Sequence, residues 1–381
     1  ISTSEDGAYS VYAADVDGDG DMDVLSAIFF DDKIAWYEQE GSPSQTTFQP
    51  QTTAALQTAV DLWVSDSASA AAAYGDINTW DVSLITDMSG LFDNKTAFND
   101  DISNWDVSSV TDMSFMFDDA RSFNQNLSTW DVSSVTTMRS MFDEAFSFNQ
   151  DLTSWDVSSV TNMQEMFDGG SSSSFNGDIS TWDVSSVTNM KKMFEETPFN
   201  GDISTWDVSS VTNMEGTFSQ ASNFNQDIST WDVSNVTTME YLFNNADSFN
   251  VDISTWDVSS VTNMHAMFYG THSFNQDISS WDISNVTIMA NMFRETVSFN
   301  QDLNDWNVSS VTTMGSMFKN ADAFNQDLND WDVSSVTNMG SMFYNANNFS
   351  SDLSGWDVSS VTNMGSMFYN ANNFSSDLSG W

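Results

Sequence analysis

Residues 231–255 read WDVSNVTTMEYLFNNADSFNVDIST, and units of this kind fill most of the 381-residue chain. The tryptophan that opens the unit returns every 25 residues, except for one step of 27 residues and one of 24. Its occurrences are Trp80, Trp105, Trp130, Trp155, Trp182, Trp206, Trp231, Trp256, Trp281, Trp306, Trp331, Trp356 and Trp381. Self-similarity at a fixed period of this length is typical of repeat proteins, in which stacked units share one continuous core.

Two apolar patterns within the unit predict its secondary structure. Ile228, Trp231 and Val233 follow the spacing L-x-x-L-x-L, which is typical of the strand of a leucine-rich repeat. Residues 239–246 place Met, Leu, Phe and Ala at i, i+3, i+4 and i+7, which predicts a short helix. We therefore expect a repeat solenoid of leucine-rich-repeat-like α/β coils. The aromatic and methionine columns should form its core, rather than a surface that stacks a cofactor or a sugar.

A longer pattern, F-N-x-D-I-S-x-W-D-V-S-x-V-T-x-M-x-x-M-F, runs through the units, and residues 48–92 lead into the first of them. This pattern resembles the BspA-type, mycoplasma-surface class of leucine-rich-like repeats, and the resemblance covers residues 48–381. It implies a secreted or surface-anchored protein, often an adhesive one. It does not imply an enzyme.

The segment before the repeats carries alternating aspartates that predict a calcium loop of the form D-x-D-x-D-G-x-x-D. The candidate ligands are Asp15, Asp17, Asp19, Asp21 and Asp23. Oxygen ligands at alternate positions converge on one hard cation, and a glycine at position 20 allows the sharp turn. We expect Asp21 to contribute its backbone carbonyl and the other four to contribute carboxylates to Ca²⁺. The alternative is a solvated acidic turn.

Residues 9–14, 24–30 and 33–38 read as strands on either side of this loop. Loop and strands together resemble one blade of the FG-GAP or VCBS type, as found in calcium-binding β-propellers. Because a propeller needs several blades, the resemblance implies either further blades before this one or a blade that packs on a neighbour.

The chain therefore divides into four predicted parts. These are a β segment over residues 1–40, a linker over 41–50, a helical N-terminal cap over 51–75 and a solenoid of about 12 repeats over 76–381. Thr52 or Thr53 is the expected N-cap of the cap helix. Residues 331–355 and 356–380 are identical, which fits recent duplication or a repeat copied when the sequence was assembled. We expect the array to be truncated at its C-terminal end.

The charge of the chain excludes several partners. There are 55 acidic and 8 basic residues, a formal net charge of −47, and no cysteine. Such a field repels nucleic acid and anionic membrane surfaces, and the lack of thiols excludes disulfides and thiolate metal sites. No apolar run of the sequence is long enough to span a bilayer.

Two columns of aspartate accompany the repeat tryptophan. One aspartate follows it in 11 of 12 units, and another precedes it by four residues in 12 of 13. Because stacked carboxylates repel one another, something must offset their charge. We expect each to accept backbone and serine hydrogen bonds within its own turn, with a row of bound Ca²⁺ as the alternative. Columns of hydroxyls on a solenoid also suggest ice binding, but the interleaved carboxylates argue against it.

Two sets of surface residues are candidate sites. Seven N-x-[S/T] sequons are candidate glycosylation sites in a secreted protein, at Asn94, Asn126, Asn235, Asn285, Asn307, Asn348 and Asn373. Variable positions on the predicted helix side of the unit could bind a ligand, and they carry Arg139, Lys191, Lys192, Tyr241 and His265.

The sequence favours a structural role over catalysis. It has only two histidines and no GxSxG or HExxH motif, and its carboxylate pairs recur in every unit. We expect a non-enzymatic extracellular protein, a glycosylated and calcium-stabilised surface rod or filament protomer. Its partners would be further repeats or other copies of the chain, joined head to tail. The alternative is a surface adhesin that binds glycans or surface proteins through the variable positions.

Overall fold

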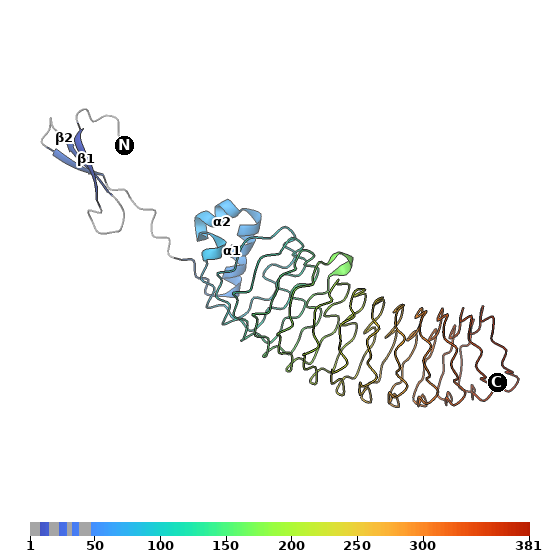
Figure 1. The fold of residues 1–381 in the computed structure, drawn as a ribbon. Coiled ribbons are helices and arrows are strands. Elements are labelled where there is room, and N and C mark those ends of the chain that lie inside the picture. The colour runs from blue at the N-terminus through green and yellow to red at the C-terminus, as the bar shows by residue number, and fades with distance from the viewer. Residues whose placement is uncertain (1–7, 15–22, 29–32, 38–46) are drawn as a thin grey trace. The chain divides into compact units, whose positions relative to one another are not determined.

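The computed structural model of the chain describes residues 8–14, 23–28, 33–37 and 47–381. The chain divides into two compact units, Ile1–Phe48 and Gln49–Trp381. The second unit contains the helices that precede the repeats and all of the repeats, and Figure 1 traces it as a stack of coils.

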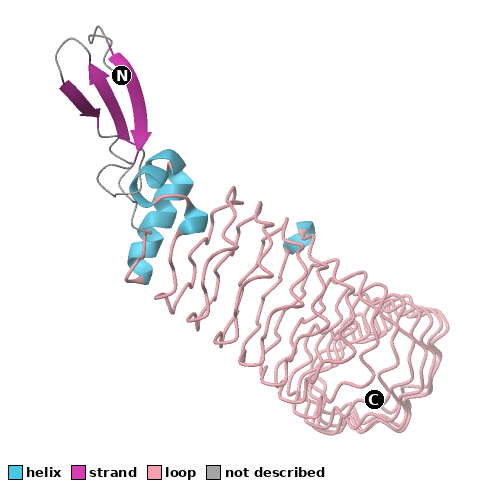
Figure 2. Ribbon diagram, turned by 60° about the vertical axis from the view of Figure 1, so that its left-hand side comes forward, coloured by secondary structure: helices cyan, strands magenta, loops and turns pink. Residues whose placement is uncertain are grey.

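The described part of the first unit is a three-stranded antiparallel sheet. Its strands are β1 (Ala8–Ala14), β2 (Asp23–Ile28) and β3 (Lys33–Tyr37), paired in the order β1-β2-β3 and drawn in magenta in Figure 2. They lie where the sequence predicts strands. The pairing of Ala14 with Asp23 closes the hairpin between β1 and β2.

Two helices precede the first repeat, α1 (Thr53–Ser65) and α2 (Ser67–Tyr74). Thr52 is the N-cap of α1, and its hydroxyl accepts a hydrogen bond from the backbone N–H of Ala55 at 3.2 Å. The helical spacing in the sequence indicates which face of α1 is apolar, and the same face is buried. Its residues are Leu56, Ala59, Val60 and Trp63.

Helix α1 occupies the place that a preceding coil would take. In the interior of the array, the carbonyl of Asp112 accepts a backbone N–H from the preceding coil at 2.9 Å. Asp87 holds the same position in the first coil, and its carbonyl accepts the hydroxyl of Thr53 at 2.7 Å. Gln57 likewise donates its side-chain amide to the carbonyl of Leu91 at 3.1 Å. These side chains provide hydrogen-bond donors for carbonyl groups at the edge of the first coil that no preceding coil can pair, as the cap of a solenoid must.

Each repeat forms one coil, and successive coils stack in register (Figure 1). One parallel β-bridge joins each coil to the next, in a column that runs from Asp87 to Asn363. A threonine beside this column extends the ladder, since Thr111 donates its N–H at 2.8 Å and its hydroxyl at 3.1 Å to the carbonyl of Thr86. The same pair of bonds recurs in the coils that follow, so each coil is held to the last by main chain and side chain.

The prediction of a helix over residues 239–246 is wrong. Among the described residues of the repeats, the only helices are two single 3₁₀ turns, η1 (Ile77–Thr79) and η2 (Gly170–Ser172). Residues 239–246 form consecutive turns in which Tyr241 and Asn245 adopt left-handed φ values of 57° and 52°. With a left-handed residue at every fourth position, these turns point the same side chains into the core as a helix would. The apolar residues of the turns therefore have the spacing that is typical of a helix.

The backbone hydrogen bonds explain why turns replace the helix. The N–H of Tyr241 donates to the carbonyl of His265 in the next coil at 2.9 Å, whereas that of Leu242 donates to Met239 in its own turn at 3.1 Å. A helix would direct every N–H to a carbonyl four residues earlier and leave none for the neighbouring coil. A left-handed residue other than glycine costs about 1–2 kcal/mol, which the bonds between coils and the shared core offset.

The prediction of a strand over residues 228–233 is also wrong. An aspartate before this stretch and one within it bend the chain, because Asp227 accepts the N–H of Ser229 and Asp232 that of Ser234, both at 3.0 Å. Such side-chain turns compete with a strand for the backbone. The repeats are therefore stacked coils of turns and bends, and the expected α/β composition does not hold.

The core of the array is built from the predicted columns. Trp231 is 4% exposed, and its indole N–H donates to the carbonyl of Ile203 in the preceding coil at 3.2 Å. The ring of Phe243 lies 3.8 Å from that of Phe249 and stacks at 5.8 Å on its equivalent in each neighbouring coil. Every interior coil buries the same rings against its neighbours, so the core is continuous along the stack.

Candidate functional site

The five candidate ligand-binding residues lie on one side of the coils, in two neighbouring columns. Arg139, Lys191 and His265 occupy the second position after the β-bridge, and Lys192 and Tyr241 the third. The positions belong to turns and not to the expected helix, and the third is left-handed, with φ of 55° at Lys192 and 57° at Tyr241. Stacking therefore brings residues from different coils to one face, although Arg139 lies two coils from Lys191.

Both lysines are already paired. Lys191 forms an ion pair with Glu215 at 2.9 Å, and Lys192 forms one with Glu195 at 2.6 Å. The other predicted cation, Arg139, lies 3.9 Å from Glu165. The basic side chains of this face consequently offer little unpaired positive charge to an anionic ligand.

Tyr241 is the aromatic member of this face. Its side chain is 37% exposed, and its ring stands nearly perpendicular to the imidazole of His265, with 5.1 Å between ring centroids. Burial and the neighbouring carboxylates of Glu240 and Glu215 raise the pKa of the Tyr241 phenol. The phenol thus keeps its proton at neutral pH and remains a hydrogen-bond donor.

Gly216 opens a hollow of about 230 Å³ beside Tyr241. It holds the same left-handed position as Lys192 in the coil before and Tyr241 in the coil after, with φ of 62°. A Cβ at Gly216 would lie 3.2 Å from Cγ of Lys192, so any side chain there would fill the space. Gly216 is not among the candidate residues that the sequence suggests, because it stands out only when the same position is compared across coils.

A second hollow, of about 280 Å³, lies at the corner where the repeat length changes. The 27-residue step contains Ser173, and the 24-residue step contains Pro198. Both residues line the hollow with Glu196, Ser222 and others. Gln220 lines both hollows, so the two adjoin.

Aspartates at one position of four successive coils form what we term the acidic column. Its members are Asp93, Asp118, Asp143 and Asp168. The residue after each of the first three donates its N–H to the carbonyl of the next aspartate in the column, at 2.8 Å each time. This ladder fixes the carboxylates one coil apart.

The acidic column shifts the ionisation of its own members. Burial, followed by repulsion from Asp168 and Asp118, raises the pKa of Asp143 to about 8. Burial is also the main cause that raises the pKa of Asp168 to about 7 and of Asp118 to about 6. At neutral pH the middle of the column therefore holds protons that ordinary carboxyls release.

Asp131 and Asp227, one from each aspartate column beside the tryptophans, behave in the opposite way. Asp131 accepts both the N–H of Ser133 at 3.1 Å and its hydroxyl at 2.6 Å, and the hydroxyl bond is the main cause that lowers the pKa of Asp131. Asp227 makes the same pair of bonds with Ser229, at 3.0 and 2.7 Å, and its pKa is lowered as well. The predicted hydrogen bonding within each turn is confirmed for these columns.

The predicted calcium loop lies mostly outside the described residues. Asp15, Asp17, Asp19 and Asp21 fall in the stretch that is not described, and Asp23 is the first residue of β2. The hairpin of β1 and β2 brings the two ends of this stretch together. Among the residues that the structure describes, no group of three or more acidic or histidine side chains is placed to hold a metal ion.

All seven sequon asparagines are exposed: Asn94, Asn126, Asn235, Asn285, Asn307, Asn348 and Asn373. Several already use the side-chain amide. Asn235 donates to the carbonyl of Ser209 in the preceding coil at 2.8 Å, and Asn285 does the same with Ser259. An attached glycan would leave one amide hydrogen for this bond, so the geometry is compatible with modification.

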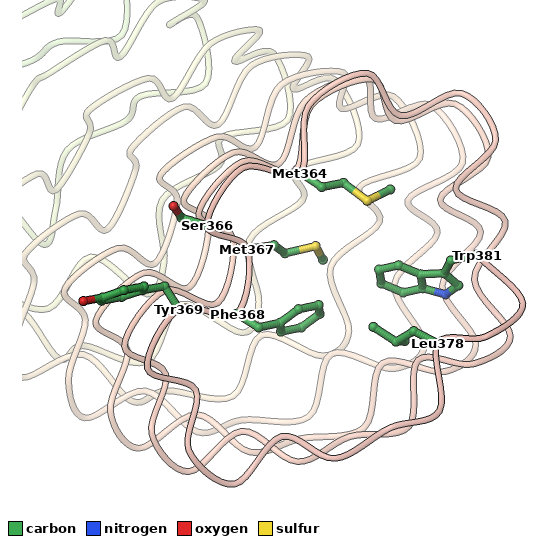
Figure 3. A pocket seen from close by; sticks show the side chains of 7 residues that line it. All are labelled: Met364, Ser366, Met367, Phe368, Tyr369, Leu378 and Trp381. Atoms are coloured by element: carbon green, nitrogen blue, oxygen red, sulfur yellow. The ribbon is translucent and has the colours of Figure 1, made fainter.

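The coil at residues 356–381 has an open face. Met364 and Trp381 line a hollow of about 410 Å³ on it (Figure 3). Their equivalents one coil earlier, Met339 and Trp356, are 0% and 4% exposed beneath the following coil. The open face thus carries the same apolar groups that every interior coil buries against its neighbour.

Comparisons with known proteins identify a repeat family. A family model described as a mycoplasma protein of unknown function, DUF285, matches three successive stretches, residues 63–172, 169–281 and 267–381. No curated protein and no solved structure matches the chain. Within the described residues, no helix is both long enough and apolar enough to cross a membrane.

Proposed function

The chain belongs to the DUF285 family of mycoplasma proteins, and from this premise we propose that it is a non-enzymatic rod of the cell surface. We assign its coils to the leucine-rich-repeat-like solenoids, with turns in place of helices. The rod is a spacer or filament protomer, glycosylated at exposed sequons and stabilised by calcium in its first unit.

One observation carries the proposal: the aromatic stacking continues through the coils. Phe117 lies 5.4 Å from Phe142 in the next coil, and Phe343 lies 5.7 Å from Phe368 near the other end. Interlocked rings and a hydrogen-bonded ladder resist bending and shear, because each coil contacts both neighbours over its whole cross-section. Such a stack is suited to holding two points apart.

Assembly into filaments is supported by the way the coils stack, since each interior coil buries apolar groups against the coil before it and the coil after it. A face of this kind can receive a further repeat or a coil of a second copy of the chain. Repetition of such a heterologous contact produces a fibre. The surface location is supported by the exposed sequons, and calcium by the alternating aspartates in the sequence between β1 and β2.

Electron microscopy of the full chain at micromolar concentration tests the rod and the filament together. We expect straight particles whose repeat portion is roughly 60 Å long, from a spacing of ~4.8 Å per coil, and end-to-end joining as concentration rises. Met364→Lys should suppress the joining by placing a charge on the open face. Leu84→Lys is the matched control, since Leu84 is 51% exposed on the side of a coil.

Two outcomes count against this function. Particles resembling beads on a flexible string would overturn the rod, and discrete monomers alone at micromolar concentration would overturn the filament. Calcium is tested separately by titration calorimetry. We expect one Ca²⁺ per chain in the wild type and none after Asp17→Asn combined with Asp19→Asn, with Asp305→Asn as the control.

A further inference from the structure

The coil at residues 206–230 interrupts the regularity of its neighbours on one face. Where neighbouring coils carry Lys192 and Tyr241, it carries Gly216, and the hollow of about 230 Å³ opens between those two side chains. Where the first four coils carry the acidic column, it carries Ser219, whose hydroxyl donates to Glu195 at 3.0 Å. These substitutions replace a packed, charged surface with a recess that has polar walls.

The second hollow arises beside this coil because the repeat length changes there. The extra residues around η2 end at Ser173, the shortened repeat contains Pro198, and both of these residues line the hollow. Gln220 stands between the two hollows and donates its side-chain amide to Glu196 at 2.7 Å. The two irregular repeat lengths and the glycine thus coincide at one place on the array.

We propose that the two adjoining hollows bind a neutral oligosaccharide, with one sugar unit in each. Each hollow is smaller than the roughly 300–1,000 Å³ that takes a drug-sized ligand, so each suits one small ring. The first offers the aromatic ring of Tyr241 as a wall, and the second is lined by hydroxyl, amide and carboxylate groups. Their shared wall, Gln220, sits where the link between two sugar units would pass.

The chemistry of the walls selects this class of ligand. An aromatic face provides apolar contact for the C–H side of a sugar, while its phenol supplies a donor. Glu215 and Glu196 supply acceptors for sugar hydroxyls, and Asn223 and Asn244 supply both donors and acceptors. An anionic sugar or phosphate is disfavoured because Lys192 is already paired and the chain carries a net charge of −47.

The array provides its own replacements for testing the site. Tyr241→Ser installs the residue found at Ser316, and Gly216→Asn installs the one found at Asn291, both left-handed in the same column with φ of 58° and 59°. The first removes the aromatic wall and the second fills the hollow. Asn291→Ser makes a comparable exchange in the same column away from the hollows, and it serves as the control.

The experiment screens the full chain by saturation-transfer NMR against soluble neutral oligosaccharides, namely glucan, galactan and N-acetylglucosamine oligomers. Sialyllactose and spermine represent anionic and cationic ligands. We expect at least one neutral oligosaccharide to bind, and both site variants to weaken it at least about tenfold while the control does not. Thermal unfolding of the variants checks that the fold is retained.

Three results would overturn the proposal. These are no neutral oligosaccharide bound at millimolar concentration, binding that Gly216→Asn leaves intact, and binding restricted to sialyllactose or spermine. None of them bears on the rod or the filament, because neither variant alters the core or the open face at residues 356–381.

Discussion

The two ends of one surface column carry opposite chemistry on the same backbone. In the first coils this position forms the acidic column, Asp93, Asp118, Asp143 and Asp168. In the last coils the same position carries Arg294, Lys319, Tyr344 and Tyr369, where Lys319 lies 4.7 Å from the ring centroid of Tyr344 and the two tyrosines stack at 4.8 Å. One half of the column is repulsive and the other attractive.

The neighbouring left-handed column differs in the same sense. In the first coils it includes Asp119 and Glu144, whereas in the last it forms an amide ladder. Asn345 donates to Asn320 at 2.8 Å, and Asn370 donates to Asn345 at 3.1 Å. Because backbone and core are the same at both ends of the column, the surface chemistry is free to vary. Of these two ends, only the one that carries the acidic column should respond to pH near neutrality.

The largest expected effect is the loss of stability when a core phenylalanine is removed, and it should be equal in the first and the last coils. Phe142→Ala and Phe343→Ala each remove a ring that is 2% or less exposed and stacked on both neighbours. We expect each to lower the free energy of unfolding by about 3–5 kcal/mol. Hydrogen exchange resolved by coil is the measurement, since repeat arrays open locally. A difference of more than about 2 kcal/mol between the two, outside the scatter of core truncations, would refute a uniform core.

The second largest effect, the dependence of stability on pH, should differ between the first and the last coils. Unfolding lets the carboxyl of Asp143 ionise near its ordinary value of 3.8, whereas the folded coil holds its proton up to about pH 8. The folded state binds more protons in this window, so the stability of the first coils should fall as pH rises from about 4 to about 8. The protection factors of amides in coils 93–168, which are exchange rates corrected for the intrinsic rate at each pH, should fall over that range, and those in coils 319–369 should not.

Asp143→Asn should remove part of this dependence. At pH 8 we expect it to stabilise the first coils by on the order of 1–2 kcal/mol, after allowance for solvent screening of a partly exposed carboxyl. Asp305→Asn, an exposed aspartate outside the columns, is the control and should change little. Destabilisation by Asp143→Asn at pH 8 would mean that the fold does not disfavour the ionised carboxylate of Asp143.

The aspartate turns beside the tryptophans should again be equal in the two halves. Asp131 and Asp332 accept the same two bonds from Ser133 and Ser334, at 3.1 and 2.6 Å in both coils. We expect Asp→Ala at either position to cost about 1 kcal/mol. Because these bonds lower the pKa of both carboxyls, their contribution is lost as pH falls below about 4, measured by acid unfolding of wild type against each variant.

The smallest effect concerns the attractive half of the column. Lys319→Met keeps the aliphatic stem but removes the charge over Tyr344, and we expect a loss of about 0.5–1 kcal/mol, as for an exposed cation–π pair. Urea unfolding followed by exchange in the last coils is the measurement. If neither the stability nor the exchange at Tyr344 changed, the contact between Lys319 and Tyr344 would contribute nothing to the stability of the last coils.

The candidate site was only partly predictable from the chain. Lys191, Lys192, Tyr241 and His265 depart from the repeat pattern, so a search for variable positions finds them. Gly216 also departs from it, but a glycine among variable residues carries no chemistry by itself. Its importance comes from Lys192 and Tyr241, which stand 24 and 25 residues away along the chain and beside it in the stack.

The sequence by itself determined that this is a repeat array, with its period, its aromatic core and its aspartate turns, because these depend on spacing within one unit. Only the tertiary structure decided that residues 239–246 form turns and not a helix. Both conformations direct the same side chains inward, and they differ in whether the N–H of a residue such as Tyr241 is used within its own turn or by the next coil. The turns are stable only when the next coil is present, because its carbonyl groups accept the N–H groups that a helix would use internally.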